Sequence, residues 1–261
     1  MSRLVLLNYA DRQFRSAQRL NSRSGKGIGG FDGAIAYGPD DIDAQFAIQH
    51  KDTLTAARGG GYWLWKPHLI LRTLRQLRPG DWLFYCDAGA VFVGSIQPVV
   101  RLASELGLDV VTFEVEHLER QYTKRDVFVE LSADVPSITD TPQRCGGFQL
   151  YRVSKQAIDF AATLLARSTI DGLITDSPNR FGRENYPDFI AHRHDQSILS
   201  VLSKQWGIPA FRDPSQFGNP FMDMYESCTY PQLIELTRQR DVPRWKAGTR
   251  WVRHWLIGRG R

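Results

Sequence analysis

The sequence predicts an α/β protein with a mainly parallel sheet flanked by helices, and two observations carry this prediction. Short apolar runs typical of buried strands alternate along the chain with longer segments whose apolar residues recur at helical spacing. One run, residues 82–86, follows a Pro-Gly-Asp turn and ends at a single carboxylate, Asp87. Ligands of open α/β sheets bind beyond the carboxyl ends of the strands, so Asp87 is the first candidate functional residue.

Strands and helices are expected to alternate in chain order. The expected strands lie at residues 4–7, 82–86, 108–113 and 147–151. The expected helices lie at residues 68–77, 95–106, 155–167 and 195–205. Pro67 suits the first turn of one helix and Ser154 the N-cap of another. The Gly-rich residues 22–33 and the polar residues 168–189 predict loops, and the chain beyond residue 206 gives no clear pattern.

Composition indicates a globular protein with a real core. The chain has 261 residues, of which 42% are hydrophobic and 23% are charged. Its apolar runs are far shorter than the roughly 20 residues of a membrane span, and its start is strand-like rather than a signal peptide. We therefore expect a cytoplasmic protein. Three widely spaced cysteines favour neither a disulfide framework nor a cysteine-based zinc site.

A Gly-rich, aromatic turn before the predicted helix at 68–77 is a candidate diphosphate site. Arg58 and Lys66 flank this turn. Two cations together with backbone N–H groups at a helix start favour a diphosphate. Trp63 and Trp65 could stack on a base or a sugar ring, or could be core aromatics.

Two further motifs are candidates for ligand contact. The paired glycines Gly146 and Gly147 at a strand start favour close approach of the backbone to a ligand, or else a β-bulge or tight turn. Asp195 and Gln196 begin a predicted helix, where Asp195 is either a functional carboxylate or the N-cap. Asp87 has a similar alternative, because an Asp after a strand can simply cap the following turn.

The end of the chain is basic and rich in Trp. Residues 244–261 contain Arg and Lys, three tryptophans and no acidic residue. This composition suits the interface of an anionic membrane, and equally a solvated basic helix that packs its tryptophans on the domain. Because the basic charge is concentrated in this tail and no groove-reading motif occurs, nucleic acid is not an expected partner.

Taken in order, these motifs resemble those of GT-A glycosyltransferases. The resemblance is closest to the retaining family 8 and to related small bacterial enzymes with Gly-Tyr-Trp-Leu-Trp-Lys-Pro and His-Arg-x-Asp-Gln-Ser motifs, which occur here at residues 61–67 and 192–197. It covers residues 3–205. It implies a GT-A-like, nucleotide-diphospho-sugar transferase domain at 1–235, followed by the basic tail at 236–261.

The resemblance also implies roles for individual residues. Nucleotide binding falls to Asn8, Tyr9, Arg58, Lys66 and Asp87, with Asn8 and Tyr9 at the nucleobase. The donor sugar is lined by Gly146, Gly147, Phe148 and Asp195. Asp195 and Gln196 are the implied catalytic residues, with the Gln196 amide oxygen supporting the anomeric centre.

The implied cofactor is a divalent cation, Mn²⁺ or Mg²⁺. The family's Asp-x-Asp motif falls on Asp87-Ala88-Gly89, so Gly89 replaces the second carboxylate. His254 is the candidate for a further ligand. Hard divalent ions need several oxygen ligands, and Asp87 alone holds one weakly.

The function expected from the resemblance is transfer of a sugar from a nucleoside-diphosphate donor, UDP-linked by expectation, to a glycan or lipid-linked acceptor. Retention of configuration, a hexosyltransferase type and a setting in bacterial surface polysaccharide synthesis are implied, with the basic tail at the inner face of the membrane. Two alternatives stay open. One is a non-catalytic nucleotide-sugar or glycan-binding protein, and the other a haloacid-dehalogenase-like phosphatase, whose general acid would fall on Gly89.

Overall fold

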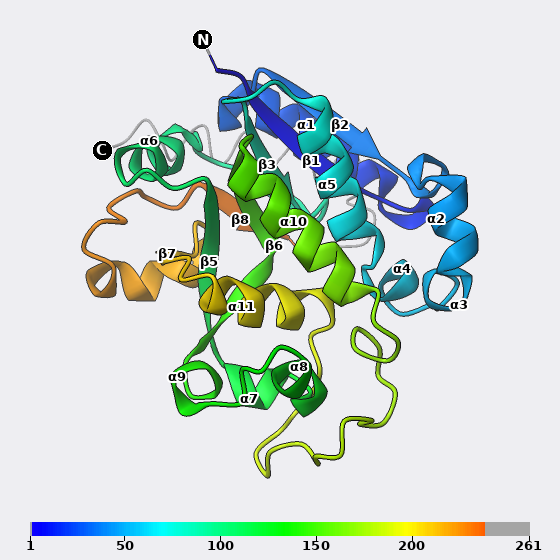
Figure 1. The fold of residues 1–261 in the computed structure, drawn as a ribbon. Helices are drawn as coiled ribbons and strands as arrows, with labels where there is room; N and C mark the ends of the chain where they lie inside the picture. The colour runs from blue at the N-terminus through cyan, green and yellow to red at the C-terminus, as the bar shows by residue number, and fades with distance from the viewer. Residues whose placement is uncertain (1, 238–261) are drawn as a thin grey trace.

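A six-stranded sheet of order β2-β1-β3-β6-β5-β7 runs through residues 2–237, the part of the chain that the computed structural model describes (Figure 1). β1 pairs in parallel with β2 and β3, and β5 with β7, whereas β6 runs antiparallel to β3 and β5. The predicted, mainly parallel sheet is confirmed. Its strands are β1 (Leu4–Tyr9), β2 (Gly33–Tyr37), β3 (Trp82–Cys86), β5 (Val110–Leu118), β6 (Pro142–Arg152) and β7 (Ala210–Arg212).

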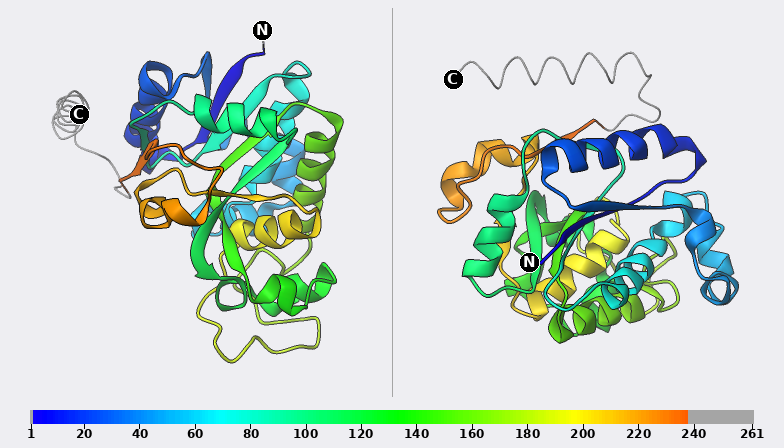
Figure 2. Two further views of the ribbon diagram at one scale, coloured as in Figure 1. Left: turned by 90° about the vertical axis from the view of Figure 1, so that its left-hand side faces the viewer. Right: turned by 90° about the horizontal axis from the view of Figure 1, so that it is seen from above.

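Helices cover both faces of the sheet (Figure 2). Alternation of side chains along β3 sends Leu83 and Tyr85 into one apolar cluster, and Trp82 and Phe84 into another. The first cluster is completed by α5 (Trp65–Gln76), α10 (Lys155–Ser168) and α11 (Asp195–Gln205), and the second includes side chains of α6 (Gln97–Glu105). β3 is therefore apolar on both faces because both are covered.

Shorter elements complete the described residues. β4 (Ala90–Phe92) and β8 (Ile234–Leu236) form a separate antiparallel pair. The other helices are α1 (Arg15–Ser24), α2 (Ala44–Gln49), α3 (Lys51–Leu54), α4 (Gly59–Tyr62), α7 (Glu119–Tyr122), α8 (Arg125–Glu130) and α9 (Pro136–Thr139). Four further helical turns are η1 (Arg12–Phe14), η2 (Gly25–Gly29), η3 (Pro39–Asp41) and η4 (Gln216–Met224).

The loop predicted for residues 22–33 is wrong. α1 continues to Ser24 and a π-helical turn, η2, follows it. A Cβ atom at Gly25 would lie 2.5 Å from a methyl carbon of Leu6, and one at Gly29 would lie 2.7 Å from the ring of Phe31. These glycines let the turn pack closely on the sheet, and composition alone does not separate that role from a loop.

Among residues 2–237, no helix has both the length and the apolar character needed to cross a membrane. The predicted basic tail at 236–261 lies outside the described residues from position 238 onward, and so does His254.

The N-cap of α10 gives a test of the local argument. The Ser154 hydroxyl accepts a hydrogen bond of 3.1 Å from the Ala157 backbone N–H, as predicted. Replacing Ser154 with Ala should lower the free energy of unfolding by about 1 kcal/mol in urea titrations. The exposed Gln156→Ala on the same helix is the matched control and should change stability by less. Equal stability of wild type and S154A would contradict the cap assignment.

Candidate functional site

A cleft of about 1450 Å³ opens at the carboxyl ends of the parallel strands. Tyr9 at the end of β1, Asp87 after β3, Glu114 in β5 and Asp213 after β7 all line it. This edge of an open α/β sheet is where ligands are expected. The cleft is therefore the candidate functional site.

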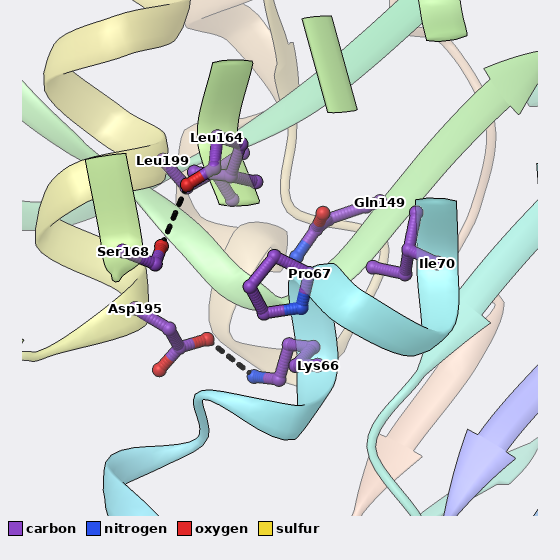
Figure 3. A pocket seen from close by; sticks show the side chains of 8 residues that line it. All are labelled: Lys66, Pro67, Ile70, Gln149, Leu164, Ser168, Asp195 and Leu199. Carbon is purple, nitrogen blue, oxygen red and sulfur yellow. Dashed lines mark hydrogen bonds and ion pairs between the residues drawn. The ribbon is translucent and has the colours of Figure 1, made fainter. Parts of the chain in front are cut away.

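A buried ammonium group lies beneath the cleft floor. The Nζ atom of Lys66 lies 2.7 Å from Oδ2 of Asp195 and 3.5 Å from Oδ1 of Asp87. It also donates a hydrogen bond of 3.1 Å to the Gly146 carbonyl oxygen. Figure 3 shows the side chains of Lys66 and Asp195 pointing toward each other from α5 and α11. Predicted residues of four separate motifs thus meet at one place.

Burial and the neighbouring charges shift the pKa values of this cluster in opposite directions. Burial raises the pKa of Asp195 to about 6, although the Lys66 ammonium opposes the rise. Burial alone would lower the pKa of Lys66, but the charges of Asp195 and Asp87 outweigh it, and the pKa lies above its usual value. Lys66 is therefore a fixed positive charge held in a dry environment.

Asp87 joins this cluster to the open cleft. Its side chain is 42% exposed, whereas that of Lys66 is 4% exposed. Its Oδ1 atom accepts a hydrogen bond of 2.6 Å from the Tyr85 hydroxyl. Its backbone N–H donates to the Gly147 carbonyl at 2.9 Å, which fixes β3 against β6 at this point.

A chain of amide groups supports the Gly146–Gly147 segment. The Gln196 Oε1 atom accepts a hydrogen bond of 3.0 Å from the Gly146 N–H, and its Nε2 donates to Oε1 of Gln143 at 2.6 Å. A Cβ atom at Gly146 would lie 2.8 Å from Cβ of Gln196, so only glycine permits this approach. Since the Gln196 amide oxygen already holds the backbone of Gly146, the residue is well placed to position that segment.

The Gly-rich turn forms one rim of the cleft. Gly59, Gly60 and Gly61 all have positive φ angles, of 60°, 57° and 97°, which glycine adopts at little cost. After the turn, the Trp65 ring stacks on Tyr9 with a centroid distance of 3.7 Å and an interplanar angle of 18°. Both rings line the cleft, where they offer a flat apolar surface.

His192 and His194 are both buried and hold the segment before α11 in place. The centroids of the two imidazole rings lie 5.1 Å apart. Burial lowers the pKa of both residues. The Nε2 atom of His194 accepts from Arg58 and its Nδ1 lies 2.9 Å from the Ile174 carbonyl, to which it donates. His194, with a φ of 54°, occupies the N-cap position of α11. Asp195 is therefore not the N-cap, which was the alternative to a functional role for it.

The predicted site residues differ in where they lie relative to the cleft. Those that line the cleft are Tyr9, Arg58, Asp87, Gly147, Phe148 and Gln196. Lys66, Asp195 and the carbonyl of Gly146 meet beneath its floor. Asn8 does not enter the cleft: it is fully buried, and its amide donates to Asn21 and Ser22 of α1. His254 lies outside the described residues.

The described residues fit a protein-bound divalent ion poorly. No group of three or more His, Cys, Asp or Glu side chains within residues 2–237 could hold one. Oδ1 of Asp87 already accepts from Tyr85 and faces the Lys66 ammonium, and Gly89 supplies no second carboxylate. The contacts of Asp87 therefore do not favour the predicted metal site at Asp87 and His254.

The sequence did not predict a functional role for several residues of the site. Tyr85 was assigned only to a buried strand, although its hydroxyl contacts Asp87. The buried Gln143, three residues before Gly146, was given no role, and here its Oε1 atom accepts from the Gln196 amide. Asp213 lies after the short β7, in a part of the chain without periodicity. A polar residue inside an apolar strand, as at Tyr85, was the only available signal.

No protein-family model and no curated protein sequence matches the chain. Similar solved structures are glycosyltransferases. Apo mouse xyloside xylosyltransferase 1 has a TM-score of 0.50 at 9% identity, over 93% of this chain and 99% of that one. The galactosyltransferase LgtC, in complex with donor and acceptor sugar analogs, has a TM-score of 0.50 at 15% identity, over 96% of this chain and 94% of that one.

The bifunctional glycosyltransferase WbbM, in an apo structure, also has a TM-score of 0.50, at 11% identity over 92% of this chain and 46% of that one. At such identities the likeness concerns the fold. The chain has the GT-A glycosyltransferase fold, as its ordered motifs predicted.

The raised pKa of Asp195 predicts a pH-dependent contribution to stability. The pKa is about 6 in the folded protein against 3.8 ordinarily, so the folded state binds the proton more tightly. The resulting stabilisation is full below pH 3.8 and is lost as pH rises through 6. Lys66 and Asp87 are the charged groups that face Asp195.

We therefore expect the free energy of unfolding of wild type, relative to Asp195→Asn, to fall by up to about 3 kcal/mol between pH 4 and pH 7. Urea titrations at several pH values measure it. Asp52→Asn, at an exposed position, is the control and should show no such slope. A difference between wild type and D195N that is constant with pH would contradict the prediction.

Proposed function

We propose that the protein is a glycosyltransferase that moves a sugar from a nucleoside-diphosphate donor, UDP-linked by expectation, to a glycan or lipid-linked acceptor. One observation carries the proposal: Asp87, which lines a large cleft at the carboxyl ends of the strands, converges with the buried Lys66 and Asp195. This convergence occurs in a GT-A fold. Retention of configuration and a role in bacterial surface polysaccharide synthesis remain predictions from the sequence resemblance.

Glycosyl transfer breaks the bond between the anomeric carbon and the diphosphate, and negative charge grows on the leaving group. Preorganised positive charge lowers the barrier most when it faces the atoms where that charge develops. Arg58 and Arg193 line the cleft, and their guanidinium groups are the candidates for direct contact with the diphosphate. Lys66, buried beside Asp87, supplies a fixed positive charge.

The carboxylates suit the sugar rather than the phosphates. Asp87 is partly exposed, and with Oδ1 occupied by Tyr85 its Oδ2 atom can accept a hydrogen bond from a donor-sugar hydroxyl. Asp195 fixes Lys66, and through it the carbonyl of Gly146. Gln196 holds the N–H of the same residue, so the segment that would line the sugar is held from both sides.

Substitution of Asp87 and Asp195 tests the proposed function directly. Purified Asp87→Asn and Asp195→Asn should each lose transfer by about 100-fold or more, because each removes a group that orients or balances charge at the reacting centre. Release of nucleoside diphosphate from a panel of nucleotide sugars, with mixed glycan acceptors, measures turnover. Asp52→Asn, an exposed carboxylate change, should retain wild-type turnover.

Wild-type turnover by folded D87N and D195N would contradict the site assignment. Tight binding of a nucleotide sugar with no turnover for any acceptor would instead favour the non-catalytic binding protein.

A further inference from the structure

We infer that the diphosphate of the donor binds here without a divalent ion held by Asp87, because the buried ammonium of Lys66 already counters the charge of that carboxylate. This inference rests on the proposed function, since it concerns how the same site takes a nucleoside diphosphate.

The position of Lys66 disfavours a divalent cation on Asp87. Its ammonium lies 3.5 Å from Oδ1 of Asp87, and the Tyr85 hydroxyl donates to the same oxygen. Hydrogen-bond contacts with Asp195 and the Gly146 carbonyl, at 2.7 and 3.1 Å, hold the ammonium there. The side chain is 4% exposed, so little water screens its charge. A divalent cation on Asp87 would lie close to this fixed positive charge and be repelled by it.

Asp87 also lacks a second carboxylate beside it in the chain, where Gly89 stands. Gly89 lines the cleft two residues after Asp87, and a Cβ atom there would meet no other atom within 4 Å. The backbone there leaves room for a Cβ atom, but the chain places no carboxylate at this position. A hard divalent ion needs several oxygen ligands, so Asp87 alone is a weak site.

Two other acidic side chains of the cleft, Glu114 and Asp213, are engaged elsewhere. Glu114 pairs with Arg144 and accepts from the Tyr225 hydroxyl. Oδ1 of Asp213 accepts a hydrogen bond of 2.7 Å from the Ser215 N–H. Neither forms a shared metal site with Asp87. Among the described residues, no group of three or more His, Cys, Asp or Glu side chains could hold a metal ion.

Protein cations provide the alternative counter-charge for the diphosphate. Arg58 and Arg193 both line the cleft, and their guanidinium groups are the kind that binds phosphate oxygens in pairs. With Lys66 balancing Asp87 from below, a diphosphate can approach these arginines without strong repulsion from that carboxylate.

Calorimetric titration of the full chain with UDP tests the inference, with ADP, GDP and CDP as further probes. In EDTA, the Kd of the best-bound nucleoside diphosphate should lie within about threefold of its value in MnCl₂. Binding that weakens about tenfold or more in EDTA would overturn this inference while leaving the proposed function intact. No binding by any of the four probes, with or without Mn²⁺, would overturn the proposed function and this inference with it.

Two Lys66 variants test the residue itself. Lys66→Met should weaken binding in EDTA by about tenfold or more and make it respond to Mn²⁺, because Asp87 then lacks its counter-charge. Lys66→Arg keeps the charge and should remain independent of Mn²⁺. Folded K66M that binds as the wild type does, with no Mn²⁺ response, would overturn the assignment to Lys66. If circular dichroism shows K66M unfolded, the EDTA comparison on wild type decides the question.

Discussion

The buried ammonium of Lys66, shared between Asp195 and Asp87, is the interaction on which the site depends. It joins the start of α5, the start of α11 and the end of β3, three elements far apart in the chain. A buried ion pair contributes little net stability compared with an apolar core, but removal of one partner leaves an uncompensated charge. The charge of each of these three groups therefore requires the others. Their contacts also fix their positions at the cleft.

A second buried network supports the Gly146 segment and α11. Glu119 is fully buried, pairs with Lys204 of α11 at 2.6 Å and accepts a hydrogen bond from the Gln143 amide. Gln143 in turn orients Gln196, and Gln196 holds the Gly146 N–H. α11 is thereby anchored near its beginning and near its end. Groups held in this way need little rearrangement when a ligand binds, which is what a preorganised site requires.

Local signals were sufficient for the elements that carry this cluster. The turn before β3, the Pro67 helix start and the periodicity of α11 each lie within a few residues, and these elements formed as predicted. Asn8 shows where such reasoning fails, because its direction is set by contacts with α1 rather than by its place after a strand. The loop prediction at Gly25 was wrong for another reason. In the sequence, a glycine that permits close packing cannot be told from a glycine in a loop.

Side-chain partners were harder to predict than elements. The contact between Lys66 and Asp195 spans two motifs with no common pattern, and only the sheet topology brings them together. The fit of a metal could likewise not be judged from Asp87 and Gly89 alone, because the ammonium that balances Asp87 is supplied by another element.

A crystal structure of the full chain with a bound nucleoside diphosphate tests the central claim most directly. We predict density for the diphosphate beside Arg58 and Arg193, with the base at the stacked rings of Tyr9 and Trp65 and with the Lys66 ammonium still on Asp195. A ligand bound outside this cleft, or a Lys66 ammonium found away from both carboxylates, would contradict it.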